Sequence, residues 1–375
     1  MTQRERILAV YRGEVPDTVP FMLDLSHWYY HRHRRPWDLS QSYEEPEYAL
    51  IDEHRRLGTG FYVPNLGSFY TVDYAENVQP ETVKFEHNGS PEIIWRYHTS
   101  QGVIERRRVW HEMTYSWPIS AWGVRTEQDL RILGEALSSR RFRFREDRYR
   151  AWDDHVGDNG VVYLLPGYSA MGYLLNYWMG VEAVMYAAAD WPHTLRETVE
   201  RINANNLDMI DMLAAAPGEI VIMGDNFSSD IQPPHFFAEW SRDYYAEAIR
   251  RLHAAGKYVA VHIDGQLKGS LGMFAEIGAD CADAVTPSPM GDLTPEECRR
   301  EGGADFILSG GVSPDLWLPN VELETFKEAV RTWLRLKQVS SRLIAAAGDQ
   351  VPPGADEERI TVMRDLVEAE GRYGG

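Results

Sequence analysis

Cysteine is nearly absent from this chain. Its 375 residues include two cysteines, Cys281 and Cys298, which are too few for a disulfide framework or a cysteine-rich metal site. Basic residues are also scarce, since 38 Lys and Arg stand against 57 Asp and Glu and give a formal net charge of −19. This surplus argues against a nucleic-acid backbone or an anionic membrane surface as the main partner. We therefore expect a small-molecule substrate, with no nucleic acid and no membrane as partner.

Long apolar runs and targeting signals are lacking too. No apolar stretch approaches the roughly 20 residues that a membrane span needs. Residues 1–8 do not have the charged-then-apolar order of a secretory signal. These absences favour a cytoplasmic protein. Hydrophobic residues still make up 44% of the sequence, which is ample for the core of one large domain spanning residues 1–375.

A regular alternation of strand-like and helix-like stretches is what the chain does contain. After a short helical pattern over residues 3–11, eight apolar runs are typical of strands, at residues 19–25, 61–64, 161–165, 220–223, 258–261, 281–285, 306–308 and 343–347. Eight parallel strands with right-handed helical crossovers close into a (β/α)8 barrel, the α/β fold that we expect here. A doubly wound sheet is the alternative, and it is disfavoured because no phosphate-binding glycine fingerprint follows the first run.

Residues 72–122 interrupt this alternation. Short β-type runs at residues 83–85, 93–97, 103–109 and 114–117 are separated by turn sequences such as Asn88-Gly89. They predict an antiparallel β-hairpin insertion after strand 2 rather than a second domain. Further along, the i+4 spacing of large and small apolar residues predicts one helix over residues 236–252.

Polar residues stand at the carboxyl ends of the predicted strands, which is the end where a barrel keeps its active site. His262 and Asp264 are two apart on a strand and therefore point to the same side. Carboxylates that converge there raise one another's pKa and become general acids. We therefore expect Asp225, His262 and Asp264 to be catalytic, although Asp225 could equally cap the following helix.

The same positions could hold a metal or a substrate. His262, Asp264 and Asp349 form a hard-ligand set for a divalent metal such as zinc, but a histidine at a strand end is more often structural. Gly310 and Gly311 are either a ligand-approach position or only a tight turn. The other residues that we expect to bind substrate lie at or just after strand ends: Asp24, His27, Trp28, Asn65, Tyr168 and Asn226, with Asp292 as a further strand-end carboxylate.

Residues 27–37 combine bulky aromatics with clustered cations. Such a segment can line a pocket for an anion or an aromatic ligand, or it can be an exposed basic loop over the barrel rim. Within it, Trp28, Tyr29 and Tyr30 are the residues that we least expect to belong to the core.

The order of these motifs resembles the uroporphyrinogen decarboxylase superfamily over nearly the whole chain. The resemblance rests on residues 5–13 followed by Pro16 to Pro20, on residues 167–180, on residues 225–255 and on Gly310-Gly311-Val312. Members of that superfamily are porphyrinogen decarboxylases and corrinoid-linked methyltransferases, and the resemblance implies a barrel enzyme with its site at the strand ends.

Two departures bear on the activity that the resemblance implies. The decarboxylases carry an Arg-Gln-Ala-Gly-Arg-Tyr signature after strand one, and residues 31–35 do not match it, so decarboxylation in the haem pathway is not expected. The thiol-methylating branch binds zinc through His-x-Cys and a later Cys, whereas this chain has His262-Ile-Asp264 and Asp349 in those places. Carboxylates replace both thiolates, which argues against a zinc–thiolate site.

A methyl acceptor that is not a thiol fits these departures. The resemblance then implies methyl transfer between a corrinoid, carried by a partner protein, and tetrahydrofolate, with Asp225 or Asp264 as the acid or base. Demethylation of a small oxygen or nitrogen donor is a close variant. Two other classes stay open: a lyase or decarboxylase acting on a small carboxylic acid, possibly metal-assisted, and a partner-binding barrel without chemistry.

Overall fold

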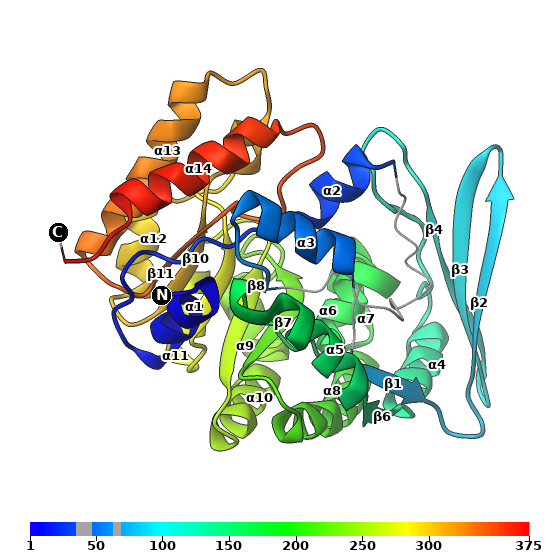
Figure 1. Ribbon diagram of the computed structural model, residues 1–375. Helices are drawn as coiled ribbons and strands as arrows, with labels where there is room; N and C mark the ends of the chain where they lie inside the picture. Colours follow the sequence, from blue (N-terminus) through cyan, green and yellow to red (C-terminus); the bar gives the residue numbers. More distant parts are fainter. Residues whose placement is uncertain (35–46, 63–68, 375) are drawn as a thin grey trace.

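A sheet of five parallel strands forms more than half of a closed barrel (Figure 1). A computed structural model describes residues 1–34, 47–62 and 69–374. The five strands are hydrogen-bonded in the reverse of their chain order, from last to first: β11 (Leu343–Ala346), β10 (Ile307–Gly311), β9 (Cys281–Val285), β8 (Tyr258–Ile263) and β7 (Ile220–Phe227).

Three earlier segments complete the ring through single parallel bridges. Leu164 pairs with Val221 of β7, Phe61 pairs with Gly160, Met22 pairs with Gly60, and Phe21 pairs with Ala345 of β11. The segments around residues 21, 61 and 162 therefore take the places of barrel strands one to three. The predicted (β/α)8 barrel is confirmed, and each of the eight predicted runs supplies one of its strands, although residues 63 and 64 of the second run lie outside the described part of the chain.

Alternation along the strands separates the barrel interior from the layer under the helices. Inward-facing side chains, among them Met22, Tyr62, Tyr163 and Cys281, pack in one cluster with Tyr11 of α1 (Gln3–Arg12). The outward-facing neighbours belong to the larger cluster beneath the surrounding helices. Because α1 packs into the interior cluster from the amino-terminal end, the opposite end of the barrel is the one left for polar side chains.

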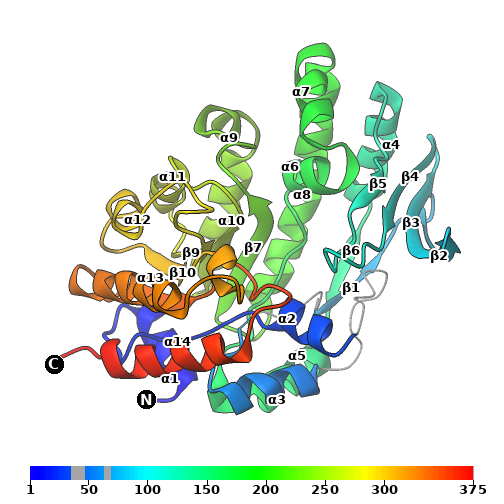
Figure 2. The same ribbon diagram turned by 90° about the horizontal axis from the view of Figure 1, so that it is seen from above.

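The helices surround this barrel (Figures 1 and 2). The longest, α8, packs on α4 and α10, and α13 packs on α14. Their bounds are α2 (Ser26–Arg32), α3 (Tyr48–Leu57), α4 (Glu127–Ser138), α5 (Glu146–Val156), α6 (Ala170–Tyr173), α7 (Val181–Asp190), α8 (Pro192–Ala215), α9 (Pro234–Trp240), α10 (Arg242–Ala254), α11 (Ser270–Glu276), α12 (Pro295–Gly302), α13 (Leu323–Arg335) and α14 (Glu357–Glu370), with 3-10 turns η1 (Gly157–Asn159), η3 (Pro314–Trp317) and η4 (Leu336–Gln338) and one π-helical turn η2 (Leu174–Trp178).

An antiparallel sheet of four strands stands beside the barrel, at the right of Figure 1. It consists of β2 (Gln79–His87), β3 (Ser90–Thr99), β4 (Gly102–Val109) and β5 (Ile119–Ala121), paired in that order. A separate antiparallel pair joins β1 (Tyr70–Asp73) to β6 (Arg141–Phe144), so the excursion returns to its starting point only after α4. The fourth predicted run, at residues 114–117, is wrong by a few residues, because the strand lies at Ile119–Ala121.

Two further sequence-based expectations need correction. The helix predicted over residues 236–252 is two helices, α9 and α10, which are separated at Ser241. The side-chain hydroxyl of Ser241 donates to the Gln232 side chain, so the break has its own hydrogen bond. Trp28, Tyr29 and Tyr30 are no more than 7% exposed and belong to the main core, because residues 26–32 fold as helix α2 instead of a loop.

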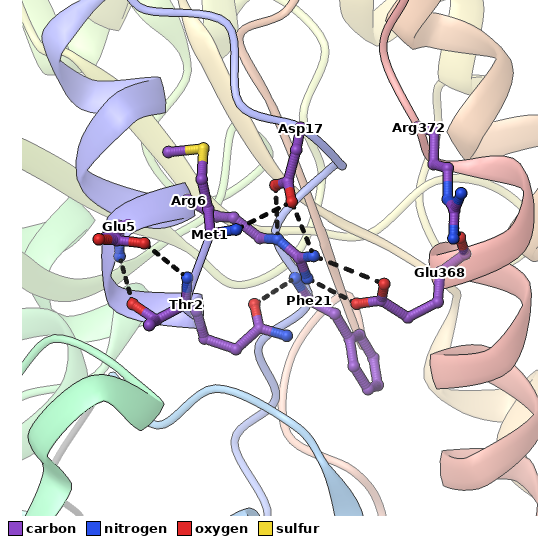
Figure 3. Close-up of polar contacts among 9 residues, drawn as sticks. Met1, Thr2, Glu5, Arg6, Asp17, Phe21, Glu368 and Arg372 are labelled. Atoms are coloured by element: carbon purple, nitrogen blue, oxygen red, sulfur yellow. Dashed lines mark hydrogen bonds and ion pairs between the residues drawn. The ribbon is translucent and has the colours of Figure 1, made fainter. Parts of the chain in front are cut away.

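The beginning and the end of the fold are tied together by Arg6 (Figure 3). Its guanidinium donates to Asp17 (Nε–Oδ1 2.8 Å) and to Glu368 of α14 (Nη1–Oε1 2.5 Å). A backbone bridge between Thr18 and Arg372 lies beside this contact. Within the residues that the structure describes, no helix is both long enough and apolar enough to cross a membrane.

Candidate active site

His262 lies at the inner face of β8, near the carboxyl end of the strand. Its Nδ1 atom is 3.0 Å from Oδ2 of Asp283, which is its direct partner across the β8–β9 register. The Asp283 side chain is 3% exposed and the His262 side chain 19%. Burial alone would lower the pKa of His262, but the hydrogen bond and charge of Asp283, with the charges of Asp349 and Asp264, raise it to about 9. The imidazole is therefore protonated at neutral pH.

Asp349 stands on the other side of the imidazole, just after β11. Its Oδ1 atom is 3.8 Å from Nε2 of His262, and its side chain is 35% exposed. Desolvation and the negative charge of Asp264 outweigh the attraction of His262 and raise the pKa of Asp349 to about 7. A carboxyl with this pKa exchanges its proton near neutral pH, which is what a general acid or base requires.

Further polar groups from neighbouring strands face the same region. Asp264 is exposed just beyond the end of β8, and its charge is among those that raise the pKa of His262 and of Asp349. Asp24 from strand one is buried and accepts hydrogen bonds from the backbone and hydroxyl of Ser26. Burial and then the charges of Asp283, Asp24 and Asp349 raise the pKa of Tyr62. The barrel mouth thus gathers one cation among several carboxylates.

Asp283 was missed by sequence reasoning, although a signal was present. It is the one charged residue in the run Cys281-Ala-Asp-Ala-Val285, and its position in that run gives it the inward direction of Cys281. Ser309 of β10, which was also missed, donates to Asp283 Oδ1 at 3.5 Å. A charged residue inside a strand that is buried on both faces is a strong indication of a functional pair.

Asp225 lies apart from this group and serves the loop after strand three. Its carboxylate is 2% exposed and accepts hydrogen bonds from Ser169, through both backbone and hydroxyl, and from the Tyr245 hydroxyl at 2.8 Å. Burial raises its pKa, and these three donors oppose that rise. With its oxygens occupied, Asp225 positions the loop; it is not placed as the acid or base.

Tyr168 and Asn226 do come together at the mouth. The Tyr168 hydroxyl donates to Asn226 Oδ1 at 3.4 Å, and Asn226 has a left-handed backbone (φ 48°) with an exposed side chain. Asn226 directly precedes Phe227, whose carbonyl accepts from the backbone N–H of Asp264. The end of β7 is in this way joined to the end of β8.

Gly310, Gly311 and Trp28, which were also predicted to bind substrate, are packed in the protein interior. Gly311 is fully buried, and a Cβ there would lie 2.4 Å from the Trp333 ring, while at Gly310 it would meet the backbone of Val285. Both glycines therefore permit close packing. Trp28 is in the core and its indole N–H donates to the Ala355 carbonyl.

Three further residues complete the set of predicted positions. His27 bonds the Tyr115 carbonyl through Nε2 at 3.0 Å. Asp292 accepts hydrogen bonds from the backbone of Leu267 and Lys268, so it fixes the loop after β8. Asn65 lies outside the described residues.

The residues present do not make up a zinc–thiolate centre. Both cysteines are buried away from the mouth, Cys281 among the interior side chains and Cys298 in α12. Within the described ranges, no three His, Cys, Asp or Glu side chains are arranged to hold a metal ion. Nε2 of His262 and Oδ1 of Asp349 are 3.8 Å apart. The hard-ligand set of His262, Asp264 and Asp349 is therefore not assembled as predicted.

Comparisons with known proteins place this arrangement in context. A sequence model described as uroporphyrinogen decarboxylase (URO-D) matches residues 167–370. A solved structure described as a methyltransferase from Methanosarcina mazei aligns over 98% of this chain and 99% of its own, with a TM-score of 0.63 and 14% identity. This likeness concerns the fold.

Other likenesses are weaker. A D-psicose 3-epimerase from Clostridium cellulolyticum aligns over 61% of this chain and 85% of its own at a TM-score of 0.38 and 10% identity. At that TM-score it carries no weight for fold or function. Among curated proteins no sequence match is found.

Proposed function

Because the chain belongs to the uroporphyrinogen decarboxylase family, we propose that it is a methyltransferase of that family. It moves a methyl group between a corrinoid and a small acceptor or donor such as tetrahydrofolate. The observation that carries the proposal is the pair of His262 and Asp349 at the end of the barrel, a protonated imidazole beside a carboxyl whose pKa is about 7.

Methyl transfer to or from nitrogen or oxygen needs a proton to move at that atom. An acceptor nitrogen loses a proton when it gains the methyl group, and a donor oxygen or nitrogen gains one when the methyl group leaves. Asp349 is the group that takes or gives this proton, because its pKa lies near the working pH. His262⁺ stabilises the carboxylate form of Asp349, before Asp349 takes the proton or after it has given it, and Asp283 keeps the imidazole in place.

The corrinoid, held by a partner protein, would supply or take the methyl group. The Asp349 side chain is 35% exposed, so the reacting end of the site is open to a group that arrives from outside. The chain's own residues hold the acceptor and its proton. Asp264, which is exposed beside them, raises the pKa of Asp349 and so keeps it near neutrality.

A visible-spectrum assay with methylcobalamin tests the proposal. The purified protein is given tetrahydrofolate in one cuvette and a thiol such as coenzyme M in another. We expect demethylation with tetrahydrofolate and none with the thiol, and we expect Asp349→Asn to lose most of this activity. Demethylation with the thiol alone would show that the carboxylate site does the work of zinc–thiolate. No transfer with any corrinoid donor or acceptor would refute the proposal.

The alternative is a lyase or decarboxylase that acts on a small carboxylic acid. The same pair favours it in one respect, because a carboxyl of pKa about 7 can protonate the carbanion that loss of carbon dioxide leaves. A metal-assisted version predicts loss of activity with a chelator. Release of carbon dioxide from a carboxylic acid, together with inactivity toward methylcobalamin, would select this alternative.

A further inference from the structure

The inner face of the inserted sheet carries a buried guanidinium with an unusual environment. Arg106 of β4 is 8% exposed, and its Cζ atom lies 4.2 Å from the ring centroid of Trp95, 4.7 Å from that of Tyr177 and 5.3 Å from that of Trp178. Trp95 is its direct partner across the β3–β4 register. Three aromatic faces therefore surround one cation.

Among the residues that the structure describes, no carboxylate is hydrogen-bonded to this guanidinium. The Nε and Nη1 atoms of Arg106 are sealed from solvent and have no hydrogen-bond partner among the described residues. A buried charge without a counter-ion is unfavourable, and cation–π contacts offset part of that cost. The contrast with the next residue is direct, since Arg107 points to the outer face and pairs with Glu105 at 2.8 Å. An unpaired buried arginine one residue away from a paired one calls for an anion.

A second cation lies on the same face. Arg108 is two residues further along β4, and its Cζ atom is 4.8 Å from the Tyr177 ring centroid. Its Nη1 donates to the Trp117 carbonyl at 3.1 Å, while its Nε is sealed without a partner. No ion pair to a carboxylate is formed by Arg106 or Arg108 within the part of the chain that the structure describes. The two positive charges repel each other, and a bound anion would reduce this repulsion.

The two arginines are connected to the barrel mouth by aromatic contacts. The Tyr177 ring packs on the Tyr168 ring at 4.7 Å, and the Tyr168 hydroxyl reaches Asn226 at the end of β7. Burial, Tyr177 and Asp225 raise the pKa of Tyr168, and the positive charge of Arg108 opposes this rise. Arg108 therefore acts on a residue of the barrel mouth. Tyr177 itself belongs to the π-helical turn η2, an element that recurs at functional sites.

We propose that Arg106 and Arg108, with Trp95, Tyr168 and Tyr177, form a subsite for the carboxylate-bearing end of a planar aromatic substrate. The rings supply stacking surface, the partly buried Arg108 binds the carboxylate, and the charge of the sealed Arg106 strengthens the attraction. This inference extends the proposed function, because it assigns a substrate class to the same barrel mouth.

The charge distribution selects a substrate with unlike ends. The reacting end of the mouth is rich in carboxylates (Asp24, Asp264 and Asp349) and repels anions. The inserted sheet offers uncompensated cations. A molecule with a carboxylate at one end and an uncharged nitrogen or oxygen at the other is therefore oriented before reaction, with its neutral end toward Asp349.

Binding of 2-naphthoate to the intact protein tests the subsite, with the neutral 2-naphthamide as the isostere. Saturation-transfer NMR and calorimetric titration measure both ligands on wild type, Arg106→Gln, Arg108→Gln and the outer-face control Arg107→Gln. Neither probe has a methyl group to transfer, so binding can succeed while the methylcobalamin assay fails, and the reverse. Thermal unfolding of each variant shows that it is folded.

We expect wild type and Arg107→Gln to bind 2-naphthoate in preference to the amide. Loss of either positive charge should weaken binding by about tenfold or more in Arg106→Gln or Arg108→Gln. Arg106→Lys should recover part of the affinity. If Arg106→Gln does not fold, Arg108→Gln decides. Equal binding of acid and amide, no binding of the acid to wild type, or full affinity in both inner-face variants would overturn the inference.

Discussion

The imidazole of His262 and the carboxylate of Asp283 face each other across β8 and β9, with Nδ1 3.0 Å from Oδ2. Their backbones are paired in the parallel register, so the sheet itself sets the distance. The Asp283 side chain is 3% exposed, and water hardly competes for it. A histidine oriented by a buried carboxylate in this way is prepared for a defined role in proton transfer.

Removing the charge of Asp283 tests that role. In Asp283→Asn the pKa of His262 should fall, because the hydrogen bond and charge that raise it are lost. We expect turnover in the methylcobalamin assay to drop by roughly 10²-fold, as for loss of a positioned acid–base group. Asp305→Asn, an exposed change at the opposite end of β10, is the matched control. Unchanged turnover in Asp283→Asn would mean that the pair only stabilises the barrel.

Asp349 should set the acidic limb of the pH–rate profile. With tetrahydrofolate as acceptor, the rate should rise as the pH passes about 7 and Asp349 ionises. It should fall again as the pH passes about 9 and His262 loses its proton. The Asp349→Asn variant should lose the acidic limb together with most of its activity, and Asp264→Asn should move that limb to lower pH, since one neighbouring charge is removed. An acidic limb that stays in place in Asp264→Asn would contradict the assignment.

The Arg6 contact predicts a specific loss of stability in acid. Its hydrogen bond lowers the pKa of Asp17 from 3.8 to about 2, even though burial opposes the shift. A lowered carboxyl pKa contributes stability that is present above pH 3.8 and lost as the pH falls through about 2. Asp17→Asn should therefore lower the free energy of unfolding at pH 6 by no more than about 1 kcal/mol, since Asp17 is partly exposed.

Denaturant titrations at pH 6 and pH 2 measure this difference. At pH 2 the free energies of unfolding of wild type and Asp17→Asn should become more similar. Glu14→Gln, an exposed change nearby that breaks no ion pair in the described residues, serves as the control. If the difference in free energy of unfolding between wild type and Asp17→Asn is as large at pH 2 as at pH 6, it arises from packing and not from the ion pair.

Gly311 distinguishes packing from ligand approach. It adopts a φ of +128°, and an added Cβ would lie 2.4 Å from Cγ of Trp333, whose indole is fixed by a hydrogen bond to the Ile344 carbonyl. We expect Gly311→Ala to lower the free energy of unfolding by roughly 1–3 kcal/mol through overpacking. Gly303→Ala, at positive φ but with open space around it, should cost less. A stable Gly311→Ala protein that no longer binds substrate would instead support the substrate-binding prediction.

The barrel could be predicted from sequence because its signals are local. Apolar runs followed by His262-Ile-Asp264 or by Gly348-Asp349 specify strands and their polar ends, and the rule for parallel strands brings those ends together. The pairing of His262 with Asp283 was not predictable in the same way. It depends on the register between β8 and β9, which no local pattern reports.

Other outcomes depended on three-dimensional context. Trp28 and Tyr30 join the core because residues 26–32 fold as a helix, although their cationic neighbours suggested a loop. The carboxylate of Asp225 accepts hydrogen bonds from Ser169 and Tyr245, which belong to other segments of the chain, and it therefore lies apart from the group at the mouth. Arg106 and Arg108 lie on one face of β4, and Arg107 between them lies on the other. Only the packing of Tyr177 against Arg106 and Arg108 shows that theirs is the inner face.

The bridge between Phe21 and Ala345 can form only after nearly the whole chain has been synthesised. At about 5–20 residues per second, the roughly 320 residues between them take between about 15 s and about 60 s to emerge from a ribosome. Throughout that interval strand one has no partner on the β11 side, and Phe21 and Leu23, both buried in the finished protein, have no final packing. The amino-terminal segment is therefore the part of this protein that depends most on protection before the barrel closes.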